Sequence, residues 1–227
     1  MKLICFDFDN VIVDGNFLMT AVQMLDNVVK EAEFTMDILR GTRDPDYFEV
    51  FVRKAISLLK GFDAKKVRGL IDVLKPMPGI KETLQALKKK GYYIIIISTN
   101  DERLIKGFLR KYKMDTYFEE IYGVKLGIHN GKLTGSVSGN VLPHEKLDTL
   151  KAIVKKHRTD PEDIIYVGDG LTDLPVLKAV GCGIVFCPDT LTKMSIFKDS
   201  EFIEKINKRK LLIIEQKDMQ QVLQFVK

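Results

Sequence analysis

The sequence predicts an α/β protein with a doubly wound, mainly parallel sheet and an inserted helical cap domain. From Ile80 onward, helical and strand-like segments alternate, which favours parallel strands joined by right-handed helical crossovers. Between the first strand and this alternating half lies a stretch with helical spacing and few strand-like runs. The chain has 227 residues, which is enough for one large core with a modest insertion.

The first part of the chain predicts a strand followed by the insertion. The apolar segment Leu3–Phe8 has the length of a strand and ends in acidic residues. Apolar residues then recur three and four apart over Leu18–Val29 and over Phe48–Leu59, a spacing typical of helices with one buried face. We therefore assign residues 1–14 and 76–227 to the core and residues 15–75 to the cap.

The rest of the chain predicts the alternating core. Pro76–Gly79 marks the return from the cap, and Asn130-Gly131 within the alternating segment 124–142 is a strong hairpin signal. Asp218 begins a short amphipathic helix near the C-terminus. The other helices are expected at Ile80–Lys90, Glu102–Lys113, Glu145–His157 and Leu174–Val180, and the other strands at Tyr92–Ser98, Phe118–Tyr122, Ile164–Val167, Gly183–Phe186 and Leu211–Ile214.

Composition excludes several classes of protein. The longest apolar run, Tyr92–Ile97, is far shorter than the about 18 residues that suggest a membrane-spanning helix. Lys and Arg number 36 against 31 Asp and Glu, but they are dispersed rather than gathered in the stripe typical of nucleic-acid-binding proteins. The three cysteines lie in or beside apolar runs, and the N-terminus has no leader pattern. We expect a cytoplasmic monomer or homodimer that binds neither nucleic acid nor membranes.

Polar residues follow three of the predicted strands directly. Asp7 and Asp9 follow the first strand, Ser98–Asn100 follow the strand at Tyr92, and Gly168–Asp173 follow the strand at Ile164. Taken singly, such residues are common caps of strand-to-helix turns. The carboxyl ends of parallel strands meet at one edge of the sheet, where ligands of these folds bind, so together they predict a binding site.

The acidic residues predict a metal site. Asp7 and Asp9 are two apart in an extended segment, so they point the same way and each disfavours ionisation of the other. With Asp169 from another strand they form an all-oxygen site suited to Mg²⁺. The alternative is that Asp7 caps a turn and Asp9 is solvated.

The neighbouring residues suit phosphoryl transfer, which needs positioning and charge neutralisation above all. A carboxylate such as Asp7 beside Mg²⁺ can attack phosphorus and form an aspartyl phosphate. The Ser98 hydroxyl and the Thr99 N–H can hold phosphate oxygens, and Lys146 can supply a fixed positive charge. Taken alone, Lys146 would be an exposed helix lysine.

These residues resemble the motifs of a known family. Phe6–Val11, Ser98–Asn100, Lys146 and Gly168–Asp173 are similar, in order, to the four motifs of the haloacid dehalogenase superfamily of phosphatases. The helical insertion between the first two motifs resembles the cap of the phosphoserine phosphatase branch. The resemblance implies the fold of that superfamily, a Rossmann-like core with a cap inserted after the first strand.

The resemblance also implies roles for the acidic residues. Asp7 is implied as the nucleophile and as a Mg²⁺ ligand. Asp9 is implied as the general acid and then the general base, and its main-chain carbonyl as a further Mg²⁺ ligand. Asp169 is implied as the third protein ligand, and Asp173 as an acid that orients a water on the metal or Lys146.

The substrate is less strongly specified. Arg53 matches the cap arginine that the family uses for the carboxylate of phosphoserine. Asn16 stands where the family commonly has a glutamate for the substrate's ammonium group, and Thr99 and Asn100 replace two glycines of the second motif. Asn10 replaces the Ser or Thr that is usual in the first motif.

We therefore predict a Mg²⁺-dependent phosphomonoester hydrolase that acts through an aspartyl phosphate on a small phosphorylated metabolite, with phosphoserine as a candidate. One alternative is a phosphotransferase, in which another alcohol replaces water. A second is a non-enzymatic phosphate-signalling module resembling a response-regulator receiver, in which the phosphorylated aspartate follows a middle strand. Here that strand ends in Ser98, which argues against a receiver.

Overall fold

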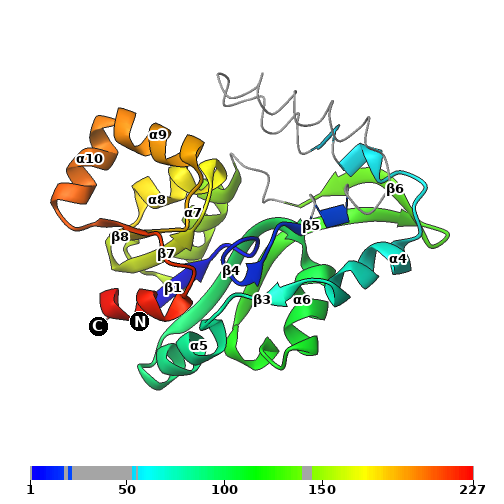
Figure 1. The fold of residues 1–227 in the computed structure, drawn as a ribbon, viewed down its shortest axis with the longest axis horizontal. Helices are drawn as coiled ribbons and strands as arrows, with labels where there is room; N and C mark the ends of the chain where they lie inside the picture. The colour runs from blue at the N-terminus through cyan, green and yellow to red at the C-terminus, as the bar shows by residue number, and fades with distance from the viewer. Residues whose placement is uncertain (1, 18–19, 22–52, 55, 140–144, 227) are drawn as a thin grey trace.

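The core is a seven-stranded sheet in the order β6-β5-β4-β1-β7-β8-β9 (Figure 1). This computed structural model describes residues 2–17, 20–21, 53–54, 56–139 and 145–226. All neighbouring strands are parallel except β5 and β6, which form an antiparallel hairpin. The predicted doubly wound, mainly parallel sheet is thus confirmed. The strands are β1 (Leu3–Phe6), β4 (Tyr93–Asp101), β5 (Glu120–His129), β6 (Lys132–Ser138), β7 (Ile164–Gly168), β8 (Cys182–Phe186) and β9 (Leu211–Ile214).

Helices cover both faces of the sheet (Figure 1). On one side lie α5 (Ile80–Lys89), α6 (Glu102–Lys111) and the C-terminal 3₁₀ helix η5 (Met219–Phe225), and on the other lie α7 (Glu145–His157), α8 (Leu174–Ala179), α9 (Thr190–Lys198) and α10 (Ser200–Asn207). The shorter helices are α4 (Ala64–Gly69) and the 3₁₀ turns η1 (Leu70–Asp72), η2 (Asp115–Tyr117), η3 (Pro161–Asp163) and η4 (Leu171–Asp173).

The central strands bury both faces, which explains why they appear in the sequence as continuous apolar runs. Ile4 and Phe6 of β1 point into the cluster that contains α5 and α6. Leu3 and Cys5 point into the opposite cluster, which contains α7 and α8. This alternation follows from the two-residue period of a strand. The polar residues after these strands are therefore held at the end of a rigid, fully buried support.

Most predicted elements agree with the structure, but a few differ from it or were not predicted. Strand β5 is one long strand that both extends the sheet and enters the hairpin, and its turn at Asn130-Gly131 has φ angles of 47° and 75°. The predicted helix after Asp218 is the 3₁₀ helix η5. Helices α9 and α10 were not predicted. Helix α9 buries only Thr192 and Ile196 and leaves other apolar side chains exposed, so that no regular apolar face marks it in the sequence.

A two-stranded ribbon joins the places where the predicted cap leaves and re-enters the core. Strand β2 (Val13–Asp14) pairs with β3 (Lys75–Pro76), so that Asp14 lies opposite Lys75. Of the cap helix predicted over Leu18–Val29, the structure describes residues 20–21, which are helical; the first part of the helix predicted over Phe48–Leu59 falls outside the described residues. Residues 53–54 and 56–58 are helical and lead to α4. The assignment of residues 15–75 to a separate cap stays a prediction.

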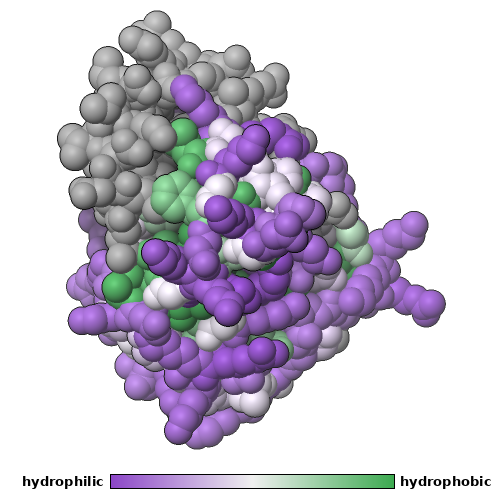
Figure 2. Space-filling model, turned by 90° about the vertical axis from the view of Figure 1, so that its right-hand side faces the viewer, coloured by the Kyte–Doolittle hydropathy of each residue, from purple (hydrophilic) through white to green (hydrophobic). Residues whose placement is uncertain are grey.

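The hairpin contacts the segment that precedes α4. The Gly61 N–H donates to the Leu133 carbonyl at 2.8 Å, and the Leu133 N–H donates to the Phe62 carbonyl at 2.9 Å. Figure 2 shows the side of the molecule that carries this hairpin, where hydrophilic residues predominate around a narrow hydrophobic strip. Within the described ranges, the helices are all too short or too polar to cross a bilayer.

Candidate active site

The sheet order brings the predicted site residues together. Strand β1 lies between β4 and β7, so its carboxyl end is flanked by theirs. Asp7 follows β1 directly, and its N–H donates to the Val167 carbonyl of β7 at 2.8 Å. Ser98 lies near the end of β4, and Asp169 follows β7. The edge that sequence reasoning selected is therefore a cluster of side chains from three neighbouring strands.

Lys146, in the first turn of α7, is fully buried in this cluster. Its exposed fraction is 0%, so the alternative of a surface lysine is wrong. Its Nζ lies 2.7 Å from Asp173 Oδ1 and 3.1 Å from Asp7 Oδ1. Burial alone would lower the pKa of Lys146, but the two carboxylates outweigh burial and raise this pKa above its ordinary value. The site thus holds a permanent positive charge beside Asp7.

Asp173 holds this lysine in place through its carboxylate. Its Oδ1 accepts hydrogen bonds from Lys146 at 2.7 Å and from the Tyr166 hydroxyl at 2.6 Å. Its Oδ2 accepts from the N–H groups of Asp169 at 3.1 Å and Gly170 at 3.2 Å. These contacts fit the predicted task of orienting Lys146. Sequence reasoning missed Tyr166, whose only signal is a hydroxyl within the buried run of β7.

Three carboxylates are close enough to hold a cation. One oxygen each from Asp7, Asp169 and Asp173 lies within 4.8 Å of the others. Burial raises the pKa of Asp7 to about 6, and burial together with the charges of Asp173 and Asp7 raises the pKa of Asp169 well above its ordinary value. Burial is the largest cause of both shifts, and a divalent cation bound between these carboxylates would favour their ionised forms.

The donor set fits such an ion. Asp7 Oδ1 is buried and accepts no hydrogen bond from the described residues, although the Lys146 ammonium lies near it. The Lys146 ammonium is its ion-pair partner, and a carboxylate oxygen beside one cation keeps a lone pair available to a ligand. Asp173 already accepts four hydrogen bonds, which leaves Asp7 and Asp169 as the freer ligands. Carboxylate oxygens are the ligands preferred by hard divalent cations.

Asp9 lies beside this cluster and is half-buried rather than freely solvated. Its Oδ1 accepts hydrogen bonds from the Phe17 N–H at 3.1 Å and from Asn100 Nδ2 at 3.2 Å. Burial, followed by the charge of Asp7, raises the pKa of Asp9 to about 7. A carboxyl group with this pKa is protonated in part near neutral pH, as a general acid must be.

The predicted phosphate-binding residues lie at the irregular end of β4. Ser98 is buried, and its Oγ accepts a hydrogen bond from the Asn100 N–H at 3.1 Å, which leaves the hydroxyl proton available to donate. Thr99 is half-buried. The pairing of β4 with β5 shifts between Ile97 and Asp101, so the backbone departs from regular strand geometry where it passes the site.

The two predicted substrate contacts are less central. Arg53 is exposed in the helical segment that precedes α4. Asn16 is half-buried at the start of the predicted cap, and its carbonyl accepts hydrogen bonds from the Thr20 N–H at 3.0 Å and the Thr20 hydroxyl at 2.8 Å. Contact of Arg53 and Asn16 with a substrate stays a prediction.

Two asparagine side chains enter the site in contacts that sequence reasoning missed. Asn10 Nδ2 donates to Asp169 Oδ2 at 2.9 Å, and Asn100 Nδ2 donates to Asp9. Asn10 has a positive φ of 54°, a conformation that asparagine tolerates better than most residues. Both residues had stood out as departures from the family motifs. The direction of their side chains, however, depends on tertiary structure.

A family model for haloacid dehalogenase-like hydrolases matches residues 1–181. The chain belongs to this family. The chain is therefore an enzyme, a phosphatase that hydrolyses phosphomonoesters, as the motifs predicted.

Known proteins similar to this chain agree with this assignment. The phosphoserine phosphatase of Methanocaldococcus jannaschii is 30% identical over 231 residues, which cover 100% of this chain and 98% of that protein. The phosphoserine phosphatase of Lactococcus lactis is 28% identical, with 90% and 91% covered. A solved phospho-aspartyl intermediate analogue of phosphoserine phosphatase superposes with a TM-score of 0.79 at 28% identity, with 100% of this chain and 99% of that chain covered.

Proposed function

We propose that the chain is a Mg²⁺-dependent phosphatase acting on phosphoserine or a close relative of it. The observation that carries the proposal is the buried Asp7 Oδ1, which accepts no hydrogen bond from the described residues and lies 3.1 Å from the Lys146 ammonium. An oxygen in this position is held ready for attack on phosphorus, with a positive charge beside it. Similarity to several phosphoserine phosphatases supports the choice of substrate class.

In the first step, an Asp7 carboxylate oxygen attacks phosphorus and forms a new P–O bond. The bond between phosphorus and the substrate oxygen breaks, and its electron pair stays on that oxygen. Asp9 gives its proton to the same oxygen, so that the leaving group departs as a neutral alcohol. The products of this step are the alcohol, the Asp7 aspartyl phosphate and an Asp9 carboxylate.

In the second step, water attacks the phosphorus of the aspartyl phosphate. Asp9 takes a proton from this water, the P–O bond to Asp7 breaks with its electrons on Asp7, and inorganic phosphate leaves. Ser98 and the Thr99 N–H hold phosphate oxygens in both steps, and Lys146 offsets the negative charge that develops near Asp7. The chain returns to its starting protonation state.

Asp7 and Asp169 would hold the cation, together with the main-chain carbonyl of Asp9. When bound, Mg²⁺ supplies positive charge that neutralises phosphate oxygens and the nucleophile. Asp173 would keep Lys146 in place rather than bind the ion, because both of its carboxylate oxygens already accept hydrogen bonds from donors of the protein. Magnesium suits this site since it accepts few protein oxygens and keeps several waters.

The substrate's amino acid part would face the cap. We assign the cap to residues 15–75 and the core to residues 1–14 and 76–227, a division supported by the pairing of Asp14 with Lys75. Arg53 would bind the substrate carboxylate, because a guanidinium matches a carboxylate in shape and charge. Asn16 would accept a hydrogen bond from the substrate's ammonium group.

Cys5, Cys182 and Cys187 are free thiols, in keeping with a cytoplasmic enzyme.

The test is phosphate release from a panel of phosphorylated amino acids, sugars and glycerol derivatives, with and without Mg²⁺. We expect phosphoserine to be preferred, Mg²⁺ to be required, and Asp7→Asn to abolish release. Asp163→Asn, an exposed acid in η3, is the matched control and should keep full activity.

A second experiment traps the intermediate. Borohydride reduction during turnover should convert residue 7 to homoserine, detected in a peptide mass spectrum, and only when Asp7 is present. Phosphate release by Asp7→Asn at the normal rate would refute the mechanism.

A further inference from the structure

We propose that Asn100 is a positioning residue that holds the Asp9 carboxyl group in one orientation toward the leaving group. This inference rests on the proposed function, in which Asp9 is the general acid. It assigns a task to a side chain that stands where the family motif has a glycine.

The amide of Asn100 is held in one orientation. The side chain is buried, and its Oδ1 accepts a hydrogen bond from the Asp101 N–H at 2.9 Å. Because the amide oxygen is occupied by a backbone donor, the amide nitrogen must point the other way. On that side lies Asp9, with Nδ2 at 3.2 Å from its Oδ1 and 3.4 Å from its Oδ2.

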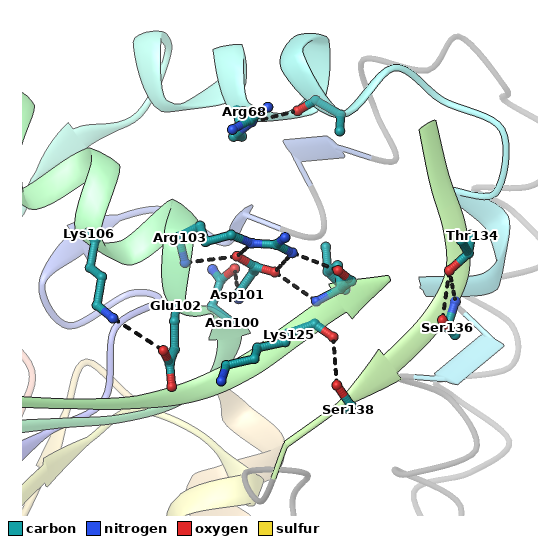
Figure 3. A network of polar contacts seen from close by, with 12 residues as sticks. Arg68, Asn100, Asp101, Glu102, Arg103, Lys106, Lys125, Thr134, Ser136 and Ser138 are labelled. Atoms are coloured by element: carbon teal, nitrogen blue, oxygen red, sulfur yellow. Dashed lines mark hydrogen bonds and ion pairs between the residues drawn. The ribbon is translucent and has the colours of Figure 1, made fainter. Parts of the chain in front are cut away.

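The backbone beneath this amide is anchored as well. Asp101 is buried, and its carboxylate accepts hydrogen bonds from Arg103 Nε at 2.9 Å, Arg103 Nη2 at 2.6 Å and the Leu126 N–H at 2.7 Å. Figure 3 shows Asn100, Asp101 and Arg103 turned toward one another at the end of β4. Gly123 of β5 packs so closely that a Cβ there would lie 2.6 Å from the Asn100 carbonyl oxygen. Asn100 is therefore a rigid donor.

Two N–H groups of the described residues hold the Asp9 carboxyl group. The Phe17 N–H donates to Oδ1 at 3.1 Å, and Asn100 Nδ2 contacts both oxygens, Oδ1 at 3.2 Å and Oδ2 at 3.4 Å. A donor that spans both oxygens fixes the rotation of the carboxyl plane. Without Asn100, the Phe17 N–H holds only Oδ1, and the carboxyl plane is less restrained. Proton transfer then loses its alignment.

The test compares two substrates that differ in their need for a proton. The alcohol of phosphoserine leaves poorly without a proton from Asp9, whereas the nitrophenolate of p-nitrophenyl phosphate leaves readily without one. The parameter is kcat/KM, since it reports the steps up to the first irreversible one, which here expels the leaving group. Hydrolysis of the aspartyl phosphate is common to both substrates and does not enter it.

For Asn100→Ala we expect kcat/KM to fall about 10- to 100-fold for phosphoserine and by less than about threefold for the aryl phosphate. Asn10→Ala is the matched control, because it removes the amide donor from Asp169, which takes no part in proton transfer. It should lower kcat/KM by a similar factor for both substrates. Equal losses for both substrates with Asn100→Ala would overturn the inference.

Two further variants keep the outcomes separable. Asn100→Asp retains an acceptor for the Asp101 N–H but has no N–H for Asp9, so it should reproduce the selective loss if Asn100→Ala does not fold. Asp9→Asn should show the same selectivity with a larger loss for phosphoserine, about 10²-fold or more. Equal losses with Asp9→Asn would refute Asp9 as the general acid and thus the proposed mechanism. A selective loss with Asp9→Asn but with neither Asn100 variant would refute the positioning role alone.

Discussion

Replacing Gly168 with alanine should disable the site without touching any residue that contacts the substrate. Gly168 ends β7, and a Cβ at this position would lie 2.4 Å from Asp173 Cγ and 2.6 Å from Asp173 Oδ2. An ordinary contact needs at least 3.4 Å, so the Asp173 carboxylate must move by about 1 Å. That movement would stretch its 2.7 Å hydrogen bond to Lys146 beyond bonding range.

The cost can be worked from the contacts that are lost. Asp173 is fully buried and binds the Lys146 ammonium, so breaking this pair leaves a buried carboxylate without its cation and should destabilise the fold by about 3 to 5 kcal/mol. Without the support of Asp173, the Lys146 ammonium should shift by about 1 Å, which should lower kcat about 10²-fold.

Urea unfolding and initial rates of phosphate release measure the two effects. Gly170→Ala is the matched control for stability, because a Cβ there has no atom within 4 Å. The control should unfold within about 0.5 kcal/mol of the wild type, apart from small propensity effects. If Gly168→Ala were as stable and as active as the wild type, the view of Asp173 as the rigid support of Lys146 would be wrong.

Other predictions concern charge and packing. Lys146→Met should abolish phosphate release and destabilise the fold by about 3 to 5 kcal/mol, since it leaves the buried Asp173 carboxylate without its cation; activity comparable to the wild type would contradict the proposed charge. Burial raises the pKa of Glu120, but hydrogen bonds from lysine, tyrosine and histidine side chains outweigh burial and lower this pKa from 4.5 to about 2. Ionised Glu120 therefore stabilises the fold above pH 4.5, and this contribution is lost as the pH falls toward 2. Wild type should lose about 1 to 2 kcal/mol more than Glu120→Gln over this range in urea titrations, and equal losses would contradict the assignment. Gly181→Ala should unfold at a temperature several degrees lower, because a Cβ there would lie 1.8 Å from the Glu162 carbonyl oxygen, while normal stability would show that the turn adjusts.

Local sequence patterns predicted the core well, because most of its strands and helices bury regularly spaced apolar residues. Helix α7 and strand β9 have the predicted bounds, Glu145–His157 and Leu211–Ile214. In α9, by contrast, Phe197 is exposed and Thr192 is buried, so the sequence carries no regular apolar face. The helix is held by its tertiary surroundings and by the Asp189 cap, which accepts a hydrogen bond from the Thr192 N–H at 2.7 Å.

The sequence predicted the part of the site whose residues lie at the carboxyl ends of the parallel strands. Asp7 and Asp169 meet because the order of parallel strands places their carboxyl ends together. The place of Lys146 in the site could be inferred only from the other site residues taken together, since a lysine in the first turn of a helix is usually exposed, and its full burial was not predicted. The contacts made by Tyr166 and Asn100 were missed, because side-chain direction at an irregular strand end depends on neighbours from other elements.

The contact between the hairpin and the segment before α4 has a consequence for self-association. A strand at the rim of a sheet normally offers free N–H and C=O groups to a strand from another molecule. Here Leu133 of β6 already exchanges both of its backbone hydrogen bonds with Gly61 and Phe62, and Lys132 forms a bridge with Asp63. Two copies of the chain therefore cannot lengthen the sheet through this stretch of the rim unless these internal bonds first break.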